Sequence, residues 1–325
     1  MNSKILNPLF YFDHSLQLNL SDFKLENPVQ SCIERMIKGP ESEFNKNKLE
    51  CFIIYAFEYA KIVFPDYYSK YSKHTYKNAA KFTILCIKTY LNLTYREICE
   101  VIELSTEIRR ILKIQKVPHY STLQKFFKKL ATSYIHSLNE VILNKFVTKC
   151  EIIALDGSGF TNDYADKYYA IIRKKERKSY TKCHIAIDVD TRLILSVQAQ
   201  RGPKHDASFT ISCLHNIKQY KPHYIVADRA YDSENIRIVI NEEINAFNII
   251  PNKKRVKNGH LRKRSRYVFR KPIYSRRNNV ESVFSVIKRI FSGINTSRDT
   301  NLSNKETKFK CLMYNIHRSI QLITR

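Results

Sequence analysis

The feature that most constrains the fold is a series of short apolar runs in the second half of the chain. Each run is rich in β-branched residues and bounded by turn-forming residues, which is the pattern of a buried strand. Helical patterns separate several of these runs. The runs are EIIALD (151–156), HIAIDVD (184–190), LILSVQAQ (193–200), HYIVAD (223–228) and FNIIP (247–251). Their order predicts a mixed α/β domain with a central sheet and helices on its faces.

The stretch YSRRNNVESVFSVIK, residues 274–288, predicts a helix with a charged ridge beside its apolar face. Four residues of the ridge fall within about 40° of one another on the helix surface. They are Tyr274, Arg277, Glu281 and Lys288, at separations of 3, 4 and 7 residues. By itself the ridge is slightly better explained as a solvated edge with i,i+4 ion pairing.

Two of the predicted strands stop at an aspartate, Asp156 and Asp228. A single aspartate at a strand end is usually a turn or cap residue. Functional groups, however, gather at the carboxyl ends of strands in open α/β sheets, and Glu281 could supply a third acid there. Carboxylates without Cys or His clusters suit Mg²⁺ or Mn²⁺. Two such ions can assist phosphoryl transfer. Other acids lie in loops or off the strand ends and are left out of this site: Asp163, Asp166, Asp188, Asp190 and Asp232.

The charge balance indicates a polyanionic partner. The 325 residues include 56 Lys and Arg against 30 Asp and Glu, a formal net charge of +26. Such a surplus points to nucleic acid. An anionic membrane is the competing explanation, but neither a spanning apolar run nor a cationic amphipathic helix is evident.

The first 20 residues lack the pattern of a signal peptide, and none of the eight scattered cysteines forms a C-x-x-C pair. We therefore expect a cytoplasmic, nucleoid-associated protein with free thiols.

Helical patterns fill the first half of the chain, at 48–68, 78–92, 94–104 and 121–130. The third begins with a predicted capping box of Thr94 and Glu97. The fourth, expected to be capped by Ser121, would turn Lys125, Lys128 and Lys129 outward, so the pair resembles a helix-turn-helix. Most helical hairpins serve only as packing units. The excess of basic residues makes DNA binding by this pair of helices an equally favoured interpretation. The predicted division is a helical segment 1–77, a helix-turn-helix-like DNA-binding region 78–149 and a catalytic domain 150–325.

A basic insertion, residues 252–273, interrupts the predicted catalytic domain. From 253 to 277, 12 of 25 residues are Lys or Arg and none is acidic. We expect this run to be exposed and to contact phosphates without reading sequence. A solubilising loop is the alternative. The predicted DNA contacts in the run are Lys253, Lys254, Arg255, Arg262, Lys263 and Arg264.

Several stretches together resemble the DDE transposases of prokaryotic insertion sequences, most closely the insertion sequence five and four groups. The stretches are LDGSGF, VADRAYDS, YSRRNNVESVFSVIK and GPKHD (202–206), and the third matches the Y-x2-R-x3-E-x6-K signature of these groups without a gap. The resemblance covers about residues 150–320. It implies an RNase H-like fold in which Asp156, Asp228 and Glu281 are catalytic and ligate two Mg²⁺ or Mn²⁺ ions.

The same resemblance implies roles for the surrounding residues. Arg277 and Lys288 would hold DNA phosphates, Tyr274 would lie against DNA, and His205 and Asp206 could support the site from behind. Asp206 could equally be a helix cap. The implied reaction is hydrolysis at the transposon ends followed by attack of the 3′-hydroxyl on target DNA, by a homodimer that joins two terminal inverted repeats. The alternatives are an RNase H-like nuclease or resolvase that cleaves without joining, and a non-catalytic DNA-binding descendant.

Overall fold

The computed structural model describes residues 47–71, 73–162, 180–202, 206–253 and 258–324. The chain divides into two compact units, residues 1–45 and 46–325, and all the described residues belong to the second. Among them, no helix is both long enough and apolar enough to cross a membrane. The cysteines of this part are free thiols, most of them buried, as the sequence predicts.

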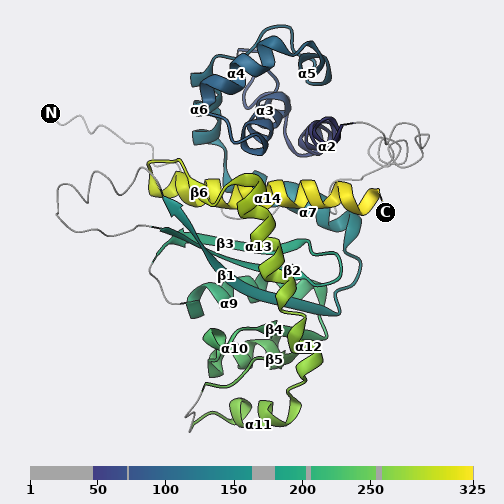
Figure 1. Cartoon of the computed structure of the whole chain (residues 1–325), viewed down its shortest axis with the longest axis vertical. Helices are drawn as coiled ribbons and strands as arrows, with labels where there is room; N and C mark the ends of the chain where they lie inside the picture. The colour runs from purple at the N-terminus through teal and green to yellow at the C-terminus, as the bar shows by residue number, and fades with distance from the viewer. Residues whose placement is uncertain (1–46, 72, 163–179, 203–205, 254–257, 325) are drawn as a thin grey trace, which may run out of the picture. The chain divides into compact units, whose positions relative to one another are not determined.

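A six-stranded mixed sheet forms the centre of this unit (Figure 1). Its strands are β1 (Ile152–Asn162), β2 (Tyr180–Asp188), β3 (Ile194–Arg201), β4 (Tyr224–Ala227), β5 (Phe247–Ile249) and β6 (Ile294–Asn295). The order is β3-β2-β1-β4-β5, with β6 pairing with the far end of β1. The first three strands are antiparallel, and β4, β5 and β6 extend the sheet in parallel. The predicted mixed α/β fold is confirmed.

Helices cover both faces of the sheet. Successive residues of a strand point to opposite faces, and neighbouring residues of β2 meet different helices. Cys183 lies 3.9 Å from Cys311, between the two sulfur atoms, on α14 (Thr300–Ile323). The ring of His184 stacks on Phe209 of α9 (Asp206–Ile217), with centroids 5.2 Å apart. One face is therefore covered by α9 and the other by α14, together with α13 (Asn278–Phe291), which packs on β1.

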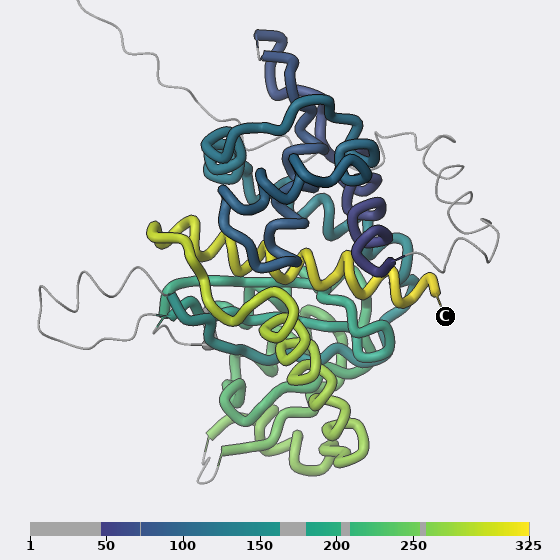
Figure 2. The backbone as a smooth tube through the Cα atoms, turned by 45° about the horizontal axis from the view of Figure 1, so that its top comes forward, coloured from purple at the N-terminus to yellow at the C-terminus, as the bar shows by residue number. Residues whose placement is uncertain are grey.

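The N-terminal helices lie around α14, most of them on the side away from the sheet (Figures 1 and 2), while Asn139 of the last one donates directly to the Ile194 carbonyl of β3 at 3.0 Å. They are α2 (Lys48–Val63), α3 (Asn78–Tyr90), α4 (Tyr95–Leu104), α5 (Thr106–Ile111), α6 (Tyr120–Lys129) and α7 (Thr132–Phe146). Phe309 of α14 contacts Phe82 of α3 and Phe127 of α6, with ring centroids 5.5 and 5.6 Å apart. Since α14 also packs on β2 and β3, this amphipathic helix joins the N-terminal helices to the sheet.

Two details of the N-terminal helices differ from the sequence prediction. The capping box of Thr94 and Glu97 is present, but α6 is capped by the side chain of His119, which accepts a hydrogen bond from the Ser121 amide. Between α4 and α6, where a short linker was expected, the chain forms the additional helix α5. With six residues, α5 is too short to show a helical period in the sequence.

The segment after β4 forms short helices around β5. They are η4 (Arg229–Tyr231), α10 (Glu234–Ile238) with η5 (Val239–Glu243), α11 (His260–Val268) and α12 (Lys271–Ser275). The expected continuous helix from Tyr274 to Lys288 was wrong at its start. Tyr274 belongs to α12, and α13 begins at Asn278 after a turn at Arg276 and Arg277. The apolar face of α13 is buried as predicted.

Candidate catalytic site

The two aspartates emerge side by side from neighbouring parallel strands. The last paired residues of β1 and β4 are Leu155 and Ala227, so Asp156 and Asp228 follow them at adjacent positions. Asp228 directly follows its strand, as predicted. Asp156 does not: the prediction of a strand end there was wrong, because pairing with β2 carries β1 on to Asn162. It is the shorter partner β4 that ends at this point, so Asp156 is paired with β2 alone.

Each aspartate is oriented by the backbone that follows it. The amide of Gly157 donates to Oδ1 of Asp156 at 2.8 Å, and the amide of Arg229 donates to Oδ1 of Asp228. Such bonds fix one oxygen of each carboxylate and leave the other for a further partner.

An arginine connects Asp156 to Glu281. Arg277, at the start of α13, donates through Nη1 to Oδ2 of Asp156 at 3.2 Å and through Nη2 to Oε1 of Glu281. The side chains of Arg277 and Asp156 are only 16% and 18% exposed, so their pairing is shielded from water, whereas Glu281 is 53% exposed. The structure thus brings two of the three predicted catalytic acids onto one guanidinium.

The pKa of Asp156 records this crowding of charge. Burial raises the pKa of Asp156 above its ordinary value, and the negative charges of Glu281 and Asp228 raise it further. The Gly157 amide and Arg277 act in the opposite direction without cancelling the rise. Burial would lower the pKa of Arg277, but Glu281 and Asp156 raise it above its usual value. The three acids therefore interact electrostatically and favour a cation between them.

Lys288 faces the same strand from the next part of α13. Its Nζ donates to Oγ of Ser158 at 2.7 Å and lies 5.6 Å from the ring centroid of Phe160. Because side chains alternate along β1, residues 156, 158 and 160 all point toward α13. Lys288 and Arg277 consequently line one face with Asp156. Ser158 is not among the residues predicted for the site, although its period-two spacing from Asp156 indicates the shared face.

Tyr274 is separated from this arrangement by the turn before α13. It is half-buried against Phe269, with ring centroids 5.3 Å apart. The amide of Arg277 donates to the carbonyl of Tyr274 at 3.0 Å, so Tyr274 stays beside the site although it lies on another helix.

The opposite face of the sheet carries a tight contact behind the aspartates. Gly157 points toward α9, where Nδ1 of His184 and the hydroxyl of Tyr231 are 2.9 Å apart. A Cβ at Gly157 would lie only 2.8 Å from the His184 ring and 3.3 Å from the Tyr231 hydroxyl. Glycine is therefore required for this close approach. The contact between His184 and Tyr231 joins β2, which pairs with β1 at Asp156, to the turn just after Asp228. It therefore helps to position both segments that carry the aspartates.

Part of the basic insertion is built into the fold. Asp232, whose side chain is fully buried, pairs with Arg237 and with Arg262 of α11, and it accepts a hydrogen bond from the Lys253 amide. Burial would raise the pKa of Asp232, but the Lys253 amide, Arg237 and Arg262 bring it below its ordinary value. Arg262, predicted as a DNA contact, thus anchors α11, and Asp232, left out as a loop residue, is its partner.

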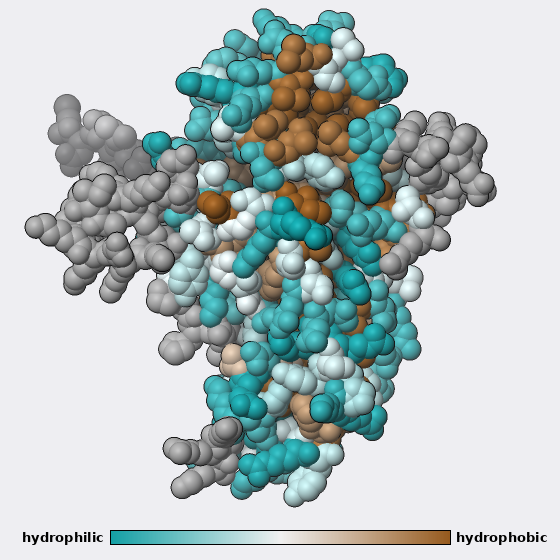
Figure 3. Space-filling model, in the orientation of Figure 1, coloured by the Kyte–Doolittle hydropathy of each residue, from teal (hydrophilic) through white to brown (hydrophobic). Residues whose placement is uncertain are grey.

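The remaining cations of the insertion divide into two groups. Lys253, Lys263 and Arg264 are exposed, as a DNA contact requires. Lys254 and Arg255 lie outside the described residues, as does His205, and Asp206 is described only as the first residue of α9. Figure 3 shows that hydrophilic side chains cover most of the visible face over α11, α12 and α13.

The donors fit a hard divalent cation by their chemistry. Asp156, Asp228 and Glu281 offer only carboxylate oxygens, the ligands that Mg²⁺ prefers, and their mutual repulsion favours a cation. Within the described residues, no three His, Cys, Asp or Glu side chains are gathered closely enough to hold a metal ion. Arg277 lies between Asp156 and Glu281 and supplies positive charge there.

Comparison with known protein families identifies the class of protein that this site defines. The family model described as Transposase DDE domain matches residues 148–316, more than half of the chain. A second model, described as Transposase domain (DUF772), matches residues 44–129. The chain belongs to the DDE transposase family, and it is a DNA transposase. The resemblance to DDE transposases seen in the sequence is confirmed.

Two further comparisons add little. No curated protein matches the chain. Among solved structures, the piggyBac transposase in its synaptic complex with hairpin DNA is similar at 7% sequence identity and a TM-score of 0.39, over 85% of this chain and 79% of that one. A likeness this distant carries no argument about the site.

Proposed function

We propose that this transposase cuts DNA at the ends of an insertion sequence and joins the exposed 3′-hydroxyl to target DNA. Asp156, Asp228 and Glu281 are the proposed catalytic and metal-binding residues. The observation that carries the proposal is the link from Asp156, which lies beside Asp228 in the sheet, through Arg277 to Glu281.

The three carboxylates would hold two Mg²⁺ or Mn²⁺ ions. When bound, such ions polarise the scissile phosphate and stabilise the charge on the attacking and leaving oxygens. Entry of the ions requires Arg277 to release at least one of its two carboxylates, because positive charges compete for the same oxygens. A guanidinium released beside the scissile phosphate is suited to a bidentate phosphate contact.

The other proposed contacts surround this centre. Lys288, whose Nζ donates to Ser158 of β1, would bind a phosphate as a point charge. Tyr274 would lie against the DNA from α12. The exposed Lys253, Lys263 and Arg264, with Lys254 and Arg255 of the same insertion, would hold the backbone without reading sequence. We further propose a homodimer, because two transposon ends must be joined, and association with the nucleoid.

The test is cleavage and joining with purified protein and a duplex that contains the DNA flanking the gene on both sides. With Mg²⁺, the wild type should release ends, and a pre-cut end should be joined to a supercoiled plasmid. Asp156→Asn should slow both steps by at least about 100-fold. Asp190→Asn, which changes an exposed aspartate at the end of the β2–β3 hairpin, is the matched control. Cleavage without joining would favour a nuclease, and unchanged cleavage by Asp156→Asn would refute the catalytic assignment.

A further inference from the structure

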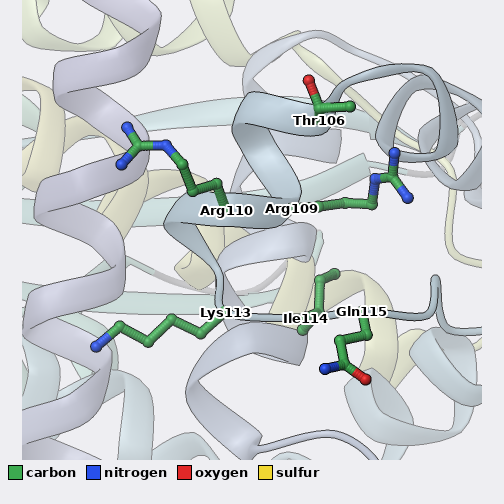
Figure 4. A pocket seen from close by; sticks show the side chains of 6 residues that line it. All are labelled: Thr106, Arg109, Arg110, Lys113, Ile114 and Gln115. Carbon is green, nitrogen blue, oxygen red and sulfur yellow. The ribbon is translucent and has the colours of Figure 1, made fainter.

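An open groove of about 560 Å³ lies beside α5, far along the chain from the proposed catalytic residues (Figure 4). Its lining combines three cationic side chains with polar and aliphatic ones, and no acid. The lining residues are Thr106, Arg109, Arg110, Lys113, Ile114 and Gln115. Figure 4 shows Arg110 and Lys113 extending to one side and Arg109 and Gln115 to the other. The groove falls within the segment that matches the second transposase model.

The cations of the groove are not all explained by internal pairing. Arg110 forms an ion pair with Glu107 of its own helix. Arg109 differs, because its Nε is buried and, in the part of the chain that the structure describes, has no hydrogen-bond partner. A buried guanidinium nitrogen without an acceptor is costly. Because Nε is closed to solvent, a ligand in the groove would meet the Nη atoms of Arg109 rather than Nε.

The backbone at Lys113 is a second, independent observation. The amide of Ile114 donates to the carbonyl of Arg109, and the amide of Lys113 donates to that of Arg110. This is the Schellman pattern that ends a helix, in which the residue in the position of Lys113 is left-handed and usually glycine. Here φ is 53° at a lysine, which strains the backbone. The turn that contains this strained residue holds Lys113 at the groove, as its third cation beside Arg109 and Arg110.

We propose that this groove binds the phosphate backbone of duplex DNA, with Arg109 and Lys113 as its principal contacts. The proposal rests on the function proposed above, in that it assigns a second DNA contact to the same enzyme. DNA is favoured by charge complementarity: between Ile108 and Pro118 the chain carries Arg109, Arg110, Lys113 and Lys116 and no acid. The DNA contact of the N-terminal helices thus lies at α5 and the turn after it, rather than only on the exposed lysines of α6.

The decisive variant is Lys113→Gly. Glycine adopts the left-handed conformation without strain, so this change should leave the melting temperature equal or higher while removing one charge from the groove. Lys221→Gly is the matched control, because Lys221 is also exposed and has a left-handed backbone, with φ 45°, but follows η3 (Lys218–Tyr220) and does not line the groove. A double variant, Arg109→Gln with Lys113→Gln, removes both principal contacts.

Binding is measured by fluorescence anisotropy with a labelled 30-base-pair duplex of arbitrary sequence, in EDTA, across a series of KCl concentrations. Each lost phosphate contact should flatten the plot of log K against log salt concentration by about 0.9. We expect a change of about 1 for Lys113→Gly, about 2 for the double variant and none for Lys221→Gly. An unchanged slope for Lys113→Gly, or an equal change for Lys221→Gly, would overturn the proposal.

The outcome is separable from that of the proposed function. The anisotropy experiment contains no divalent ion, so it reports on the groove alone. Asp156→Asn should bind the duplex with the wild-type slope and still fail to cleave it. If the wild type binds DNA but does not cleave the flanking duplex with Mg²⁺, the proposed chemistry fails and the groove stands. If cleavage is normal and the Lys113→Gly slope is unchanged, only the groove fails.

Discussion

At the scale of single residues, Arg277 determines the resting state of the site. Its guanidinium neutralises part of the charge that Asp156 and Glu281 would otherwise bring together. Arginine remains protonated at any physiological pH, so this cation leaves only by moving its side chain. The residue would therefore compete with the proposed metal ions, and it is also a candidate ligand for DNA phosphate.

Replacing Arg277 with alanine should strengthen metal binding and weaken turnover. Without the competing guanidinium, the apparent dissociation constant for Mn²⁺, measured by titration calorimetry without DNA, should fall roughly tenfold. DNA cleavage should fall as well, because a phosphate contact is lost. Arg289→Ala changes an exposed arginine in the last turn of α13 and should leave both quantities unaltered. Weaker Mn²⁺ binding by Arg277→Ala would show that this arginine orders the carboxylates rather than competing for them.

At the scale of secondary-structure elements, β1 is held from both faces. Residues 156, 158 and 160 point to α13, and Gly157 points to His184 and Tyr231 on the α9 side. The strand cannot shift toward either face without losing contacts on the other. The position of Asp156 consequently depends on residues that never touch DNA.

Gly157→Ala should destabilise the protein by about 1–3 kcal/mol, because the new methyl group meets the His184 ring within the closely packed sheet. Gly159→Ala is the control on the same strand, since its Cβ would approach no closer than 3.4 Å to the Tyr180 ring. Urea denaturation measures both changes. Equal stability of the two variants would mean that His184 moves aside freely.

The buried ion pairs at Asp232 attach α11 to the rest of the fold. Asp232→Ala would leave Arg237 buried without its carboxylate, so a loss of about 3–5 kcal/mol in unfolding free energy is expected. The folded-state pKa of Asp232 is lowered, so its contribution is present above the ordinary pKa of an aspartate and disappears as pH falls through the lowered value. The stability difference between wild type and Asp232→Asn should therefore shrink below about pH 4. A constant difference down to pH 2 would contradict this account.

At the scale of the whole unit, α14 belongs to two cores at once. It packs on β2 and β3 and also on α2, α3 and α7, and the hydroxyl of Tyr59 donates to Ser319 at 3.4 Å. The predicted boundary at residue 149 therefore does not separate two independent cores. Residues 78–149 remain a predicted DNA-binding region in function, but not a unit of folding.

Fragments 46–149 and 150–325 should accordingly each lack cooperative thermal unfolding when produced alone. The longer fragment would expose the face of α14 that carries Phe309, and should bind a hydrophobic dye. Co-expression should restore a single cooperative transition, because the apolar faces then meet. Cooperative melting of either isolated fragment would show that α14 is not a shared core element.

Much of this architecture could be predicted from the sequence, because strand and helix periods depend on local residues. The mixed sheet, the β2–β3 hairpin and the buried face of α13 follow directly from those periods. The errors concern features that depend on partners far along the chain. Asp156 lies inside a strand because β2 is longer than β4. The ion pair of Arg262 with Asp232, which the sequence did not predict, likewise depends on a contact that only the fold brings about. Nothing local to either residue carries that information.

The three acids proposed for the site can be selected from the sequence, but the cation that links Asp156 to Glu281 cannot. The spacing of Arg277 and Glu281 predicts their pairing on a helix, whereas the contact of Arg277 with Asp156 spans 121 positions. Lys113 likewise looks like any surface lysine until the backbone angle shows that it occupies a glycine position.

The three acids of the site differ in how firmly the chain holds them. Asp156 lies within β1 and is paired with Ile185 of β2, Asp228 caps a short 3₁₀ turn, and Glu281 stands on a helix that follows a two-residue break after α12. Asp156 is thus a fixed reference point, and the other two are adjustable. Substitutions that retune the geometry of catalysis should accumulate around Arg276 and after Asp228, while the middle of β1 stays unchanged. Directed evolution of this enzyme would begin at those two hinges.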